Sequence, residues 1–222
     1  MIFVQIINSL NYMNQKQILS VATVLLAFAT AIYFQPLMPA QMASHWNWQG
    51  NVDGYMTKNW ALFFFPFLMV AVNILFHFIP KIDPQKKNID KFFDSYQNFV
   101  LAFNIFFLYI YCMTIIWNMG FNMNMNAVLM PGFAFLFYFC GDLMKNTKLN
   151  YTIGIKLPWT LANETVWDKT HKLGEKLFKL TALSTLLGVF FSQYSLWFVF
   201  APLIASIVYL FIYSYLEYQK VK

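Results

Sequence analysis

Residues 97–117 read QNFVLAFNIFFLYIYCMTIIW and contain no charged side chain. About 20 apolar residues in an α-helix span the hydrocarbon core of a bilayer, so this stretch predicts a transmembrane helix. The rest of the chain has the same character, with 59% hydrophobic and 11% charged residues. Soluble domains usually carry about 25% charged residues. We therefore expect an all-α membrane protein that is surrounded by lipid along most of its length.

Four further apolar stretches follow the same pattern, and they cover residues 18–37, 60–79, 126–144 and 180–218. The last one is too long for a single span. Its most polar interruption is Ser192–Ser195, where we expect the helix to break. The sequence therefore predicts a six-transmembrane-helix bundle with a short fifth span. Lys176 and Lys179 would extend toward the lipid headgroups at the start of that span.

The lysines predict the orientation of the bundle. The net charge is +6, and fourteen of the fifteen lysines fall before the first span, between the second and third, between the fourth and fifth, or after the sixth. Only Lys58 falls on the other side. Because cytoplasmic loops carry an excess of basic residues, both termini are expected in the cytoplasm of a multi-pass plasma-membrane protein. Lysines so close to the spans suit membrane lipids, and we expect no direct nucleic-acid partner.

Three parts of the chain differ in composition. We expect an N-terminal extension over residues 1–16, in which residues 1–12 are either an upstream-start extension or an amphipathic lead. Residues 17–144 form a four-span half with an outer loop at 38–59. Residues 145–222 hold a polar segment followed by spans five and six. Within the spans, His77 and Asp142 either pair across the bundle or both reach water at its rim.

The outer loop reads PAQMASHWNWQGNVDGYMTK over residues 39–58. Its Asn51–Gly54 stretch has the composition of a tight turn. One interpretation is an interfacial turn held by aromatic side chains, with Asp53 and Lys58 as a local ion pair. The other is an outward recognition surface for a peptide or lipid. The candidate outer-face ligand-binding residues are His45, Trp46, Asn47, Asp53, Tyr55 and Lys58. The loop lacks enough ligands for a metal site.

This loop resembles the signature of the small membrane-protein module DUF1648. The shared residues are His45, Trp46, Asn47, Gly50, Asp53, Gly54, Tyr55 and Lys58. The module has a proline two positions before the histidine, where this chain has Ala43.

The second polar segment reads GIKLPWTLANETVWDKTHKLGEKLF over residues 154–178. Pro158 disfavours helix at the preceding residue, so the segment is expected to begin extended or turning. Asn163 is a good N-cap with Glu164 in the first turn. From Asn163 a helix is expected to run unbroken into span five. Its lysines form a basic stripe beside an apolar side, which predicts an amphipathic cytoplasmic helix on an anionic leaflet.

Four side chains of this helix fall on one narrow sector: Glu164, Asp168, His171 and Glu175. Such a row could ligate a cation or supply acid–base groups, which would suit a membrane enzyme or a lipid or small-molecule transporter. A solvated face with cross-stripe ion pairs explains the same row without chemistry. We favour the second interpretation, and we assign no catalytic residue, no metal site and no cofactor.

The same segment resembles the signature of the SdpI family, whose usual form is GIRTPWTLSNEEVWxKTHRxGGKLF. The order of the two motifs and the six spans fit as well. The positions at which the chain departs from that form include Lys156, Leu157, Ala162, Thr165 and Glu175. Lys156 lacks the planar fork of arginine. Ala162 and Thr165 remove a capping box, so Asn163 must cap the helix alone.

The resemblance implies an immunity and signal-transduction protein and not an enzyme. The family's namesake protects a bacterium from a secreted, membrane-active killing peptide, and once the toxin is present it also holds a winged-helix repressor at the membrane. The implied partners are a secreted peptide toxin outside and such a repressor inside. The candidate cytoplasmic partner-binding residues are Lys156, Pro158, Trp159, Asn163, Glu164, Trp167, Asp168 and His171. A structural subunit of a larger complex is a further alternative.

Overall fold

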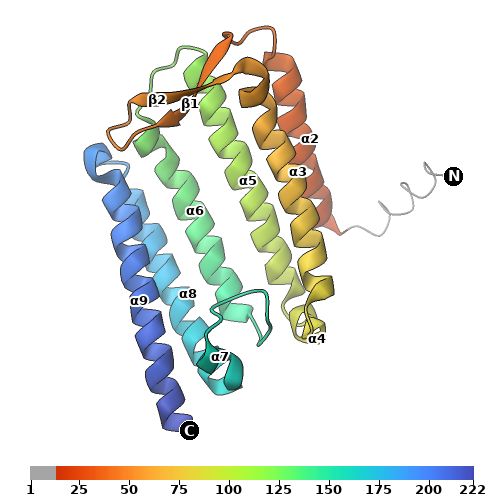
Figure 1. Ribbon diagram of the computed structural model, residues 1–222, viewed down its shortest axis with the longest axis vertical. Coiled ribbons are helices and arrows are strands. Elements are labelled where there is room, and N and C mark those ends of the chain that lie inside the picture. The colour runs from red at the N-terminus through yellow and green to blue at the C-terminus, as the bar shows by residue number, and fades with distance from the viewer. Residues whose placement is uncertain (1–13) are drawn as a thin grey trace, which may run out of the picture.

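A computed structural model of the protein describes residues 14–222, so most of the expected N-terminal extension lies outside the described residues. Long helices run side by side between two ends of the molecule (Figure 1). They are α2 (Gln15–Phe34), α3 (Lys58–Ile82), α5 (Phe93–Asn118), α6 (Met125–Asn146), α8 (Glu164–Leu187) and α9 (Ser195–Val221). Five helical segments in this part of the chain are long and apolar enough to cross a membrane. The fifth of them is Ser192–Val221, and α8, with its charged first half, is not among them.

The helix ends follow from local capping. The Asn14 side chain accepts a hydrogen bond from the Gln17 amide at 3.0 Å, and the Gln17 side chain accepts one from the Asn14 amide at 3.1 Å. This reciprocal arrangement satisfies two otherwise unpaired donors. Consequently α2 begins at Gln15, inside the range expected for the extension. The Asn124 side chain caps α6 through a single hydrogen bond, accepting from the Ala127 amide at 3.2 Å.

The expected break in the last apolar stretch is confirmed. Helix α8 ends at Leu187, a short 3₁₀ helix covers Ser192–Tyr194, and α9 begins at Ser195. The unbroken helix expected from Asn163 is also present, because α8 runs from Glu164 to Leu187. The Asn163 side chain alone caps it, accepting from the Val166 amide at 3.1 Å.

The expectation of an all-α fold is wrong in the outer loop, which forms a two-stranded hairpin. Strands β1 (Gln41–Trp46) and β2 (Val52–Thr57) pair antiparallel, with register shifts on both sides of His45. The predicted tight turn at residues 51–54 is therefore also wrong, because most of it belongs to β2. The chain turns at residues 47–51 instead.

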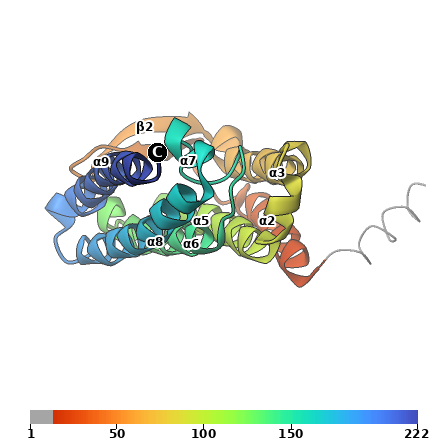
Figure 2. The same ribbon diagram turned by 90° about the horizontal axis from the view of Figure 1, so that it is seen from below.

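The helices pack around small residues. Helices α2 and α3 lie on one side of α5, while α6, α8 and α9 gather on the other side (Figure 2). Ala27 and Ala31 of α2 are fully buried in the first group. In the second group, a Cβ added at Gly141 of α6 would lie 2.9 Å from the Glu175 carbonyl oxygen of α8. Without a hydrophobic force between helices in lipid, such close backbone approach supplies the van der Waals contact that holds them together.

The two ends of the bundle differ. The hairpin covers one end, which we call the hairpin end (Figure 1). At the opposite end lie the start of α2, the C-terminus, α4 (Lys86–Asp90) and α7 (Pro158–Ala162). We call residues 147–163, which join α6 to α8, the connector, and this end the connector end. The two polar motifs of the sequence are therefore separated by the full length of the bundle.

Candidate functional site

The hairpin is fastened to the ends of two helices. At the end of α5, the Asn118 side chain accepts from the Ala43 amide at 2.7 Å and donates to the Ala43 carbonyl at 3.0 Å. It thereby acts like a further strand beside β1. From α6, the Asn126 side chain donates to the Trp48 carbonyl at 2.8 Å. An isolated two-stranded hairpin is marginally stable in water, so these contacts hold it in place.

The turn of the hairpin is organised by Asn47. Its side-chain oxygen accepts from the Gln49 and Asn51 amides, both at 3.0 Å. Its backbone amide donates to the Asn51 carbonyl at 2.8 Å. Asn47 thus uses its side-chain acceptor within the loop. The neighbouring Trp46 packs edge-on against Trp117 of α5, with 5.5 Å between ring centroids.

The outward face of the hairpin combines an ion pair with aromatic side chains. His45 Nδ1 contacts the Asp53 carboxylate, and the two side chains are 71% and 44% exposed. His45 lies opposite Gly54, where an added Cβ would come within 2.8 Å of the His45 Cβ. Trp48 and Tyr55 are also exposed. The predicted Asp53–Lys58 pair is wrong, because Asp53 contacts the cross-strand histidine and Lys58 begins α3.

At the connector end, two aromatic-ring residues of the second motif are buried. Trp167 is 0% and His171 1% exposed, and their rings stack at 4.0 Å. The Trp167 indole N–H donates to the Thr147 carbonyl at 3.0 Å, at the start of the connector. These side chains therefore hold the connector against α8.

His171 has a defined protonation state in this setting. Its Nδ1 donates to the Trp167 carbonyl at 2.8 Å, and its Nε2 accepts from the Ile155 amide at 2.8 Å. An imidazole with one donor and one acceptor nitrogen is neutral. Burial disfavours the charged form and lowers the pKa of His171 to about 4. His171 therefore serves as a neutral bridge between α8 and the connector.

Gly154 makes this bridge sterically feasible. Its φ is +116°, in a region that side chains with a Cβ rarely adopt. A Cβ added there would lie 2.4 Å from His171 Nε2 and 3.2 Å from Trp167 Cζ2. The first glycine of the motif and its tryptophan and histidine are thus parts of one packed unit.

The sequence analysis missed a buried aspartate that anchors the connector from the other side. Asp83 follows α3 and is 3% exposed. Its carboxylate accepts from the Tyr151 amide at 2.9 Å, the Thr152 hydroxyl at 2.7 Å and the Gln85 amide at 2.6 Å. In the sequence, an aspartate followed by proline is typical of a turn and gives no sign of burial.

Asn150 is a second missed residue, and it is 0% exposed. Its side chain accepts from the Ile153 amide at 2.6 Å and donates to the Ile153 carbonyl at 2.8 Å. It thus closes a small loop inside the connector. In the sequence, an asparagine between two spans is typical of a turn, and nothing in the pattern indicates that its side chain is buried.

The remaining predicted inner-face residues divide by exposure. Trp159 is half-buried, donating to the Ser214 hydroxyl of α9 at 2.6 Å and packing on Phe211. Asn163 is occupied as the cap of α8. The exposed members are Lys156, Pro158, Glu164 and Asp168. The predicted partner-binding residues therefore fall into two sets. One is exposed and mostly charged, and the other is buried or half-buried and holds the exposed residues in place.

The row of acidic and histidine side chains on α8 does not converge on one point. His171 faces inward, whereas Glu175 pairs with Lys179 at 2.8 Å and Asp168 lies 3.5 Å from Lys148. Within residues 14–222, no group of three or more His, Cys, Asp or Glu side chains is placed to hold a metal ion. The suggested pair of His77 with Asp142 is also absent from this part of the chain, and His77 accepts from Lys81 at 2.6 Å.

Comparison with known proteins finds a matching family model for each of these two regions. Residues 146–214, which span the connector, α8 and most of α9, match the SdpI/YfhL protein family. Residues 22–70, which include the whole hairpin, match the domain of unknown function DUF1648. The chain is thus similar to the SdpI/YfhL family in one of its two polar regions and to DUF1648 in the other.

The similarity extends beyond the two segments. The chain is 24% identical over 209 residues to the Immunity protein SdpI of Bacillus subtilis (strain 168), covering 93% of the chain and 97% of that protein. No solved structure matches the chain. The apolar helices and these similarities together identify a multi-pass membrane protein.

Proposed function

We propose that this protein belongs to the SdpI family and is an integral membrane immunity protein that protects the cell against a membrane-active antimicrobial peptide. The observation that carries the proposal is the similarity to an immunity protein along 93% of the chain, together with the matches to DUF1648 and to the SdpI/YfhL family. It is supported by a structure whose two polar motifs lie at opposite ends of a helical bundle.

We further propose that the hairpin faces the exterior and that both termini are cytoplasmic. The positive-inside bias supports this topology, since Lys58 is the one lysine of the chain expected at the hairpin end. In this orientation the connector and the first half of α8 meet the anionic inner leaflet.

The outward face of the hairpin is the proposed site of peptide recognition. Trp48 and Tyr55 offer exposed aromatic surface at the level where aromatic side chains favour the headgroup region. The His45–Asp53 pair adds a polar contact beside them. An amphipathic peptide approaching the membrane presents both kinds of surface, so this combination suits it.

The exposed part of the connector end is the proposed site for a cytoplasmic repressor. Lys156, Glu164 and Asp168 are exposed and carry charge of both signs, which suits specific contact with a soluble partner. The Trp167–His171 unit fixes the position of these side chains. Because α8 is one helix from Glu164 to Leu187, a shift among the helices at the hairpin end would be carried to this surface.

The proposal is tested by challenging cells that produce the protein with a panel of membrane-active peptides. Asp53→Ala and Tyr55→Ala are expected to reduce survival, whereas Gln41→Ala, an exposed change on the same hairpin outside the ion pair, is expected to protect like the wild type. Protein levels in the membrane are measured in parallel. Full protection by both Asp53→Ala and Tyr55→Ala at normal levels would remove the hairpin from peptide recognition.

Repressor recruitment has its own test. The double variant Glu164→Ala/Asp168→Ala is expected to retain peptide protection and to lose recruitment of a winged-helix protein to the membrane. Recruitment is measured by fractionating cells into membrane and soluble parts. Recruitment at the wild-type level by this double variant would contradict the proposed inner surface and leave the outer one standing.

A further inference from the structure

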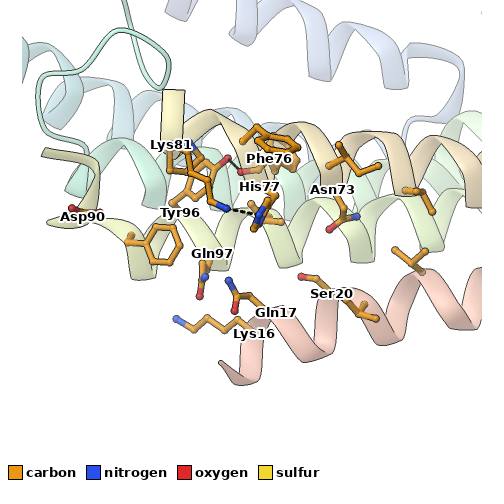
Figure 3. A pocket seen from close by; sticks show the side chains of 18 of the residues that line it. Lys16, Gln17, Ser20, Asn73, Phe76, His77, Lys81, Asp90, Tyr96 and Gln97 are labelled. Carbon is orange, nitrogen blue, oxygen red and sulfur yellow. Dashed lines mark hydrogen bonds between the residues drawn. The ribbon is translucent and has the colours of Figure 1, made fainter. Parts of the chain in front are cut away.

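A cavity of about 740 Å³ opens between α2, α3 and α5 toward the connector end. Figure 3 shows it from close by, with α2 on one side, α3 on the other and Gln97 of α5 between them. Much of its wall is aliphatic and aromatic, and that part includes Val21, Val24, Leu25, Val70, Ile74 and Phe76. This size is within the ~300–1,000 Å³ range of ordinary ligand pockets.

The rim of the cavity is basic. Lys16, Lys81 and Lys86 line it, against the single carboxylate of Asp90 among its described lining residues. Lys16 is held by Asp94 at 2.5 Å, whereas Lys81 donates to the His77 ring at 2.6 Å. The ion pairs of residues 14–222 leave Lys81 and Lys86 without a carboxylate partner. Two lysines are therefore free to meet an anion.

Deeper in the cavity, the amide side chain of Asn73 already has its hydrogen-bond partners within the protein. Asn73 and Asn104 exchange side-chain hydrogen bonds at 2.6 and 3.1 Å, and Asn73 also donates to the Met69 carbonyl. These amides need no partner from a ligand. The inner part of the cavity therefore suits a hydrocarbon chain, while the outer part suits a negative charge.

We propose that this cavity binds an anionic glycerophospholipid of the adjacent leaflet, with its phosphate at Lys81 and Lys86 and an acyl chain along the apolar wall of α2 and α3. The cavity lies among membrane-crossing helices, so lipid is the molecule present there at the highest concentration. Basic pockets between transmembrane helices are suited to anionic headgroups. In the topology proposed above, the leaflet is the cytoplasmic one.

The apolar wall and the basic rim are both needed to distinguish this ligand from others. A free phosphate would use the lysines and leave the wall unoccupied, whereas a zwitterionic lipid would use the wall and gain little from the lysines. The chain's own residues 1–13 precede helix α2, whose Lys16 and Gln17 line the cavity, so they are the competing occupant that the experiment must separate.

The test is native mass spectrometry of the full-length protein extracted from vesicles of equal parts phosphatidylglycerol and phosphatidylcholine. Wild type is expected to retain phosphatidylglycerol selectively. A lysine near the membrane surface favours anionic lipid by roughly fivefold, so Lys81→Gln/Lys86→Gln should lower that selectivity about 25-fold. Lys145→Gln/Lys172→Gln removes two exposed lysines outside the cavity and should lower the selectivity far less, because these lysines do not contact the bound lipid.

A second pair of variants tests the apolar wall. Val21→Trp places an indole at the cavity and should reduce lipid retention, while Leu26→Trp, at an exposed position on the same helix outside the cavity, should not.

Equal retention of the two lipids by wild type, or equal loss in the cavity and control variants, would overturn the proposal. Lipid binding that emerges only after residues 1–13 are deleted would assign the cavity to that segment. Binding of inorganic phosphate in place of lipid would also overturn it. Because lipid is measured directly, these outcomes are independent of peptide protection.

Discussion

Gly154→Ala is expected to be among the most destabilising single changes outside the membrane. The new Cβ would carry two costs. Holding a residue with a Cβ at φ +116° costs about 1–3 kcal/mol. The contact at 2.4 Å with His171 Nε2 must also be relieved by displacing the ring. That movement breaks the Ile155 N–H···Nε2 bond and leaves buried polar groups unpaired, at about 1–3 kcal/mol. The sum is roughly 2–6 kcal/mol, against a typical total stability of 5–15 kcal/mol.

Gly120→Ala is the matched control for this change. Gly120 also has a positive φ, +99°, but a Cβ added there meets no atom within 4 Å. The difference between the two variants therefore isolates the collision with the Trp167–His171 unit. Both are compared with wild type by denaturant unfolding in the same detergent, and by protease cleavage within the connector. Equal unfolding free energies and equal cleavage rates for the two variants would refute the argument that Gly154 is required by the buried pair.

Three further predictions concern single contacts. Burial lowers the pKa of His171 to about 4 in the folded protein. As the pH falls, the His171 imidazole is therefore protonated in the unfolded chain at a higher pH than in the folded one, which favours unfolding. Acidification from pH 7.5 to 5 should cost about 2 kcal/mol of unfolding free energy, and His171→Gln should lose that part of the pH dependence. Asn118→Ala removes both bonds to β1 and should speed proteolysis within the hairpin about tenfold or more, whereas the exposed Asn122→Ala should not. Asp83→Ala leaves connector donors unpaired and should cost about 2–4 kcal/mol by denaturant unfolding, whereas the exposed Asp90→Ala should cost under 1 kcal/mol.

The sequence was most informative where a signal is local. Apolar runs predicted the long helices, since a spanning segment must satisfy its backbone internally and is therefore helical. The N-cap at Asn163 and the break at Ser192–Ser195 also depend on near neighbours only. The same reasoning failed at residues 51–54, where turn-forming residues were placed in a strand. Cross-strand pairing and the anchor from Asn118 override that local preference.

The sequence by itself therefore determined that the chain is a helical membrane protein, where its helices run and which two polar motifs are important. Only the tertiary structure decided how those motifs are used. Trp167 and His171 lie in the predicted contact set but are buried, because the connector folds back over them. That fold depends on Asp83, which accepts bonds from residues nearly 70 positions away. Such pairings leave no periodic trace in the sequence, since they arise when distant segments are brought together by helix packing.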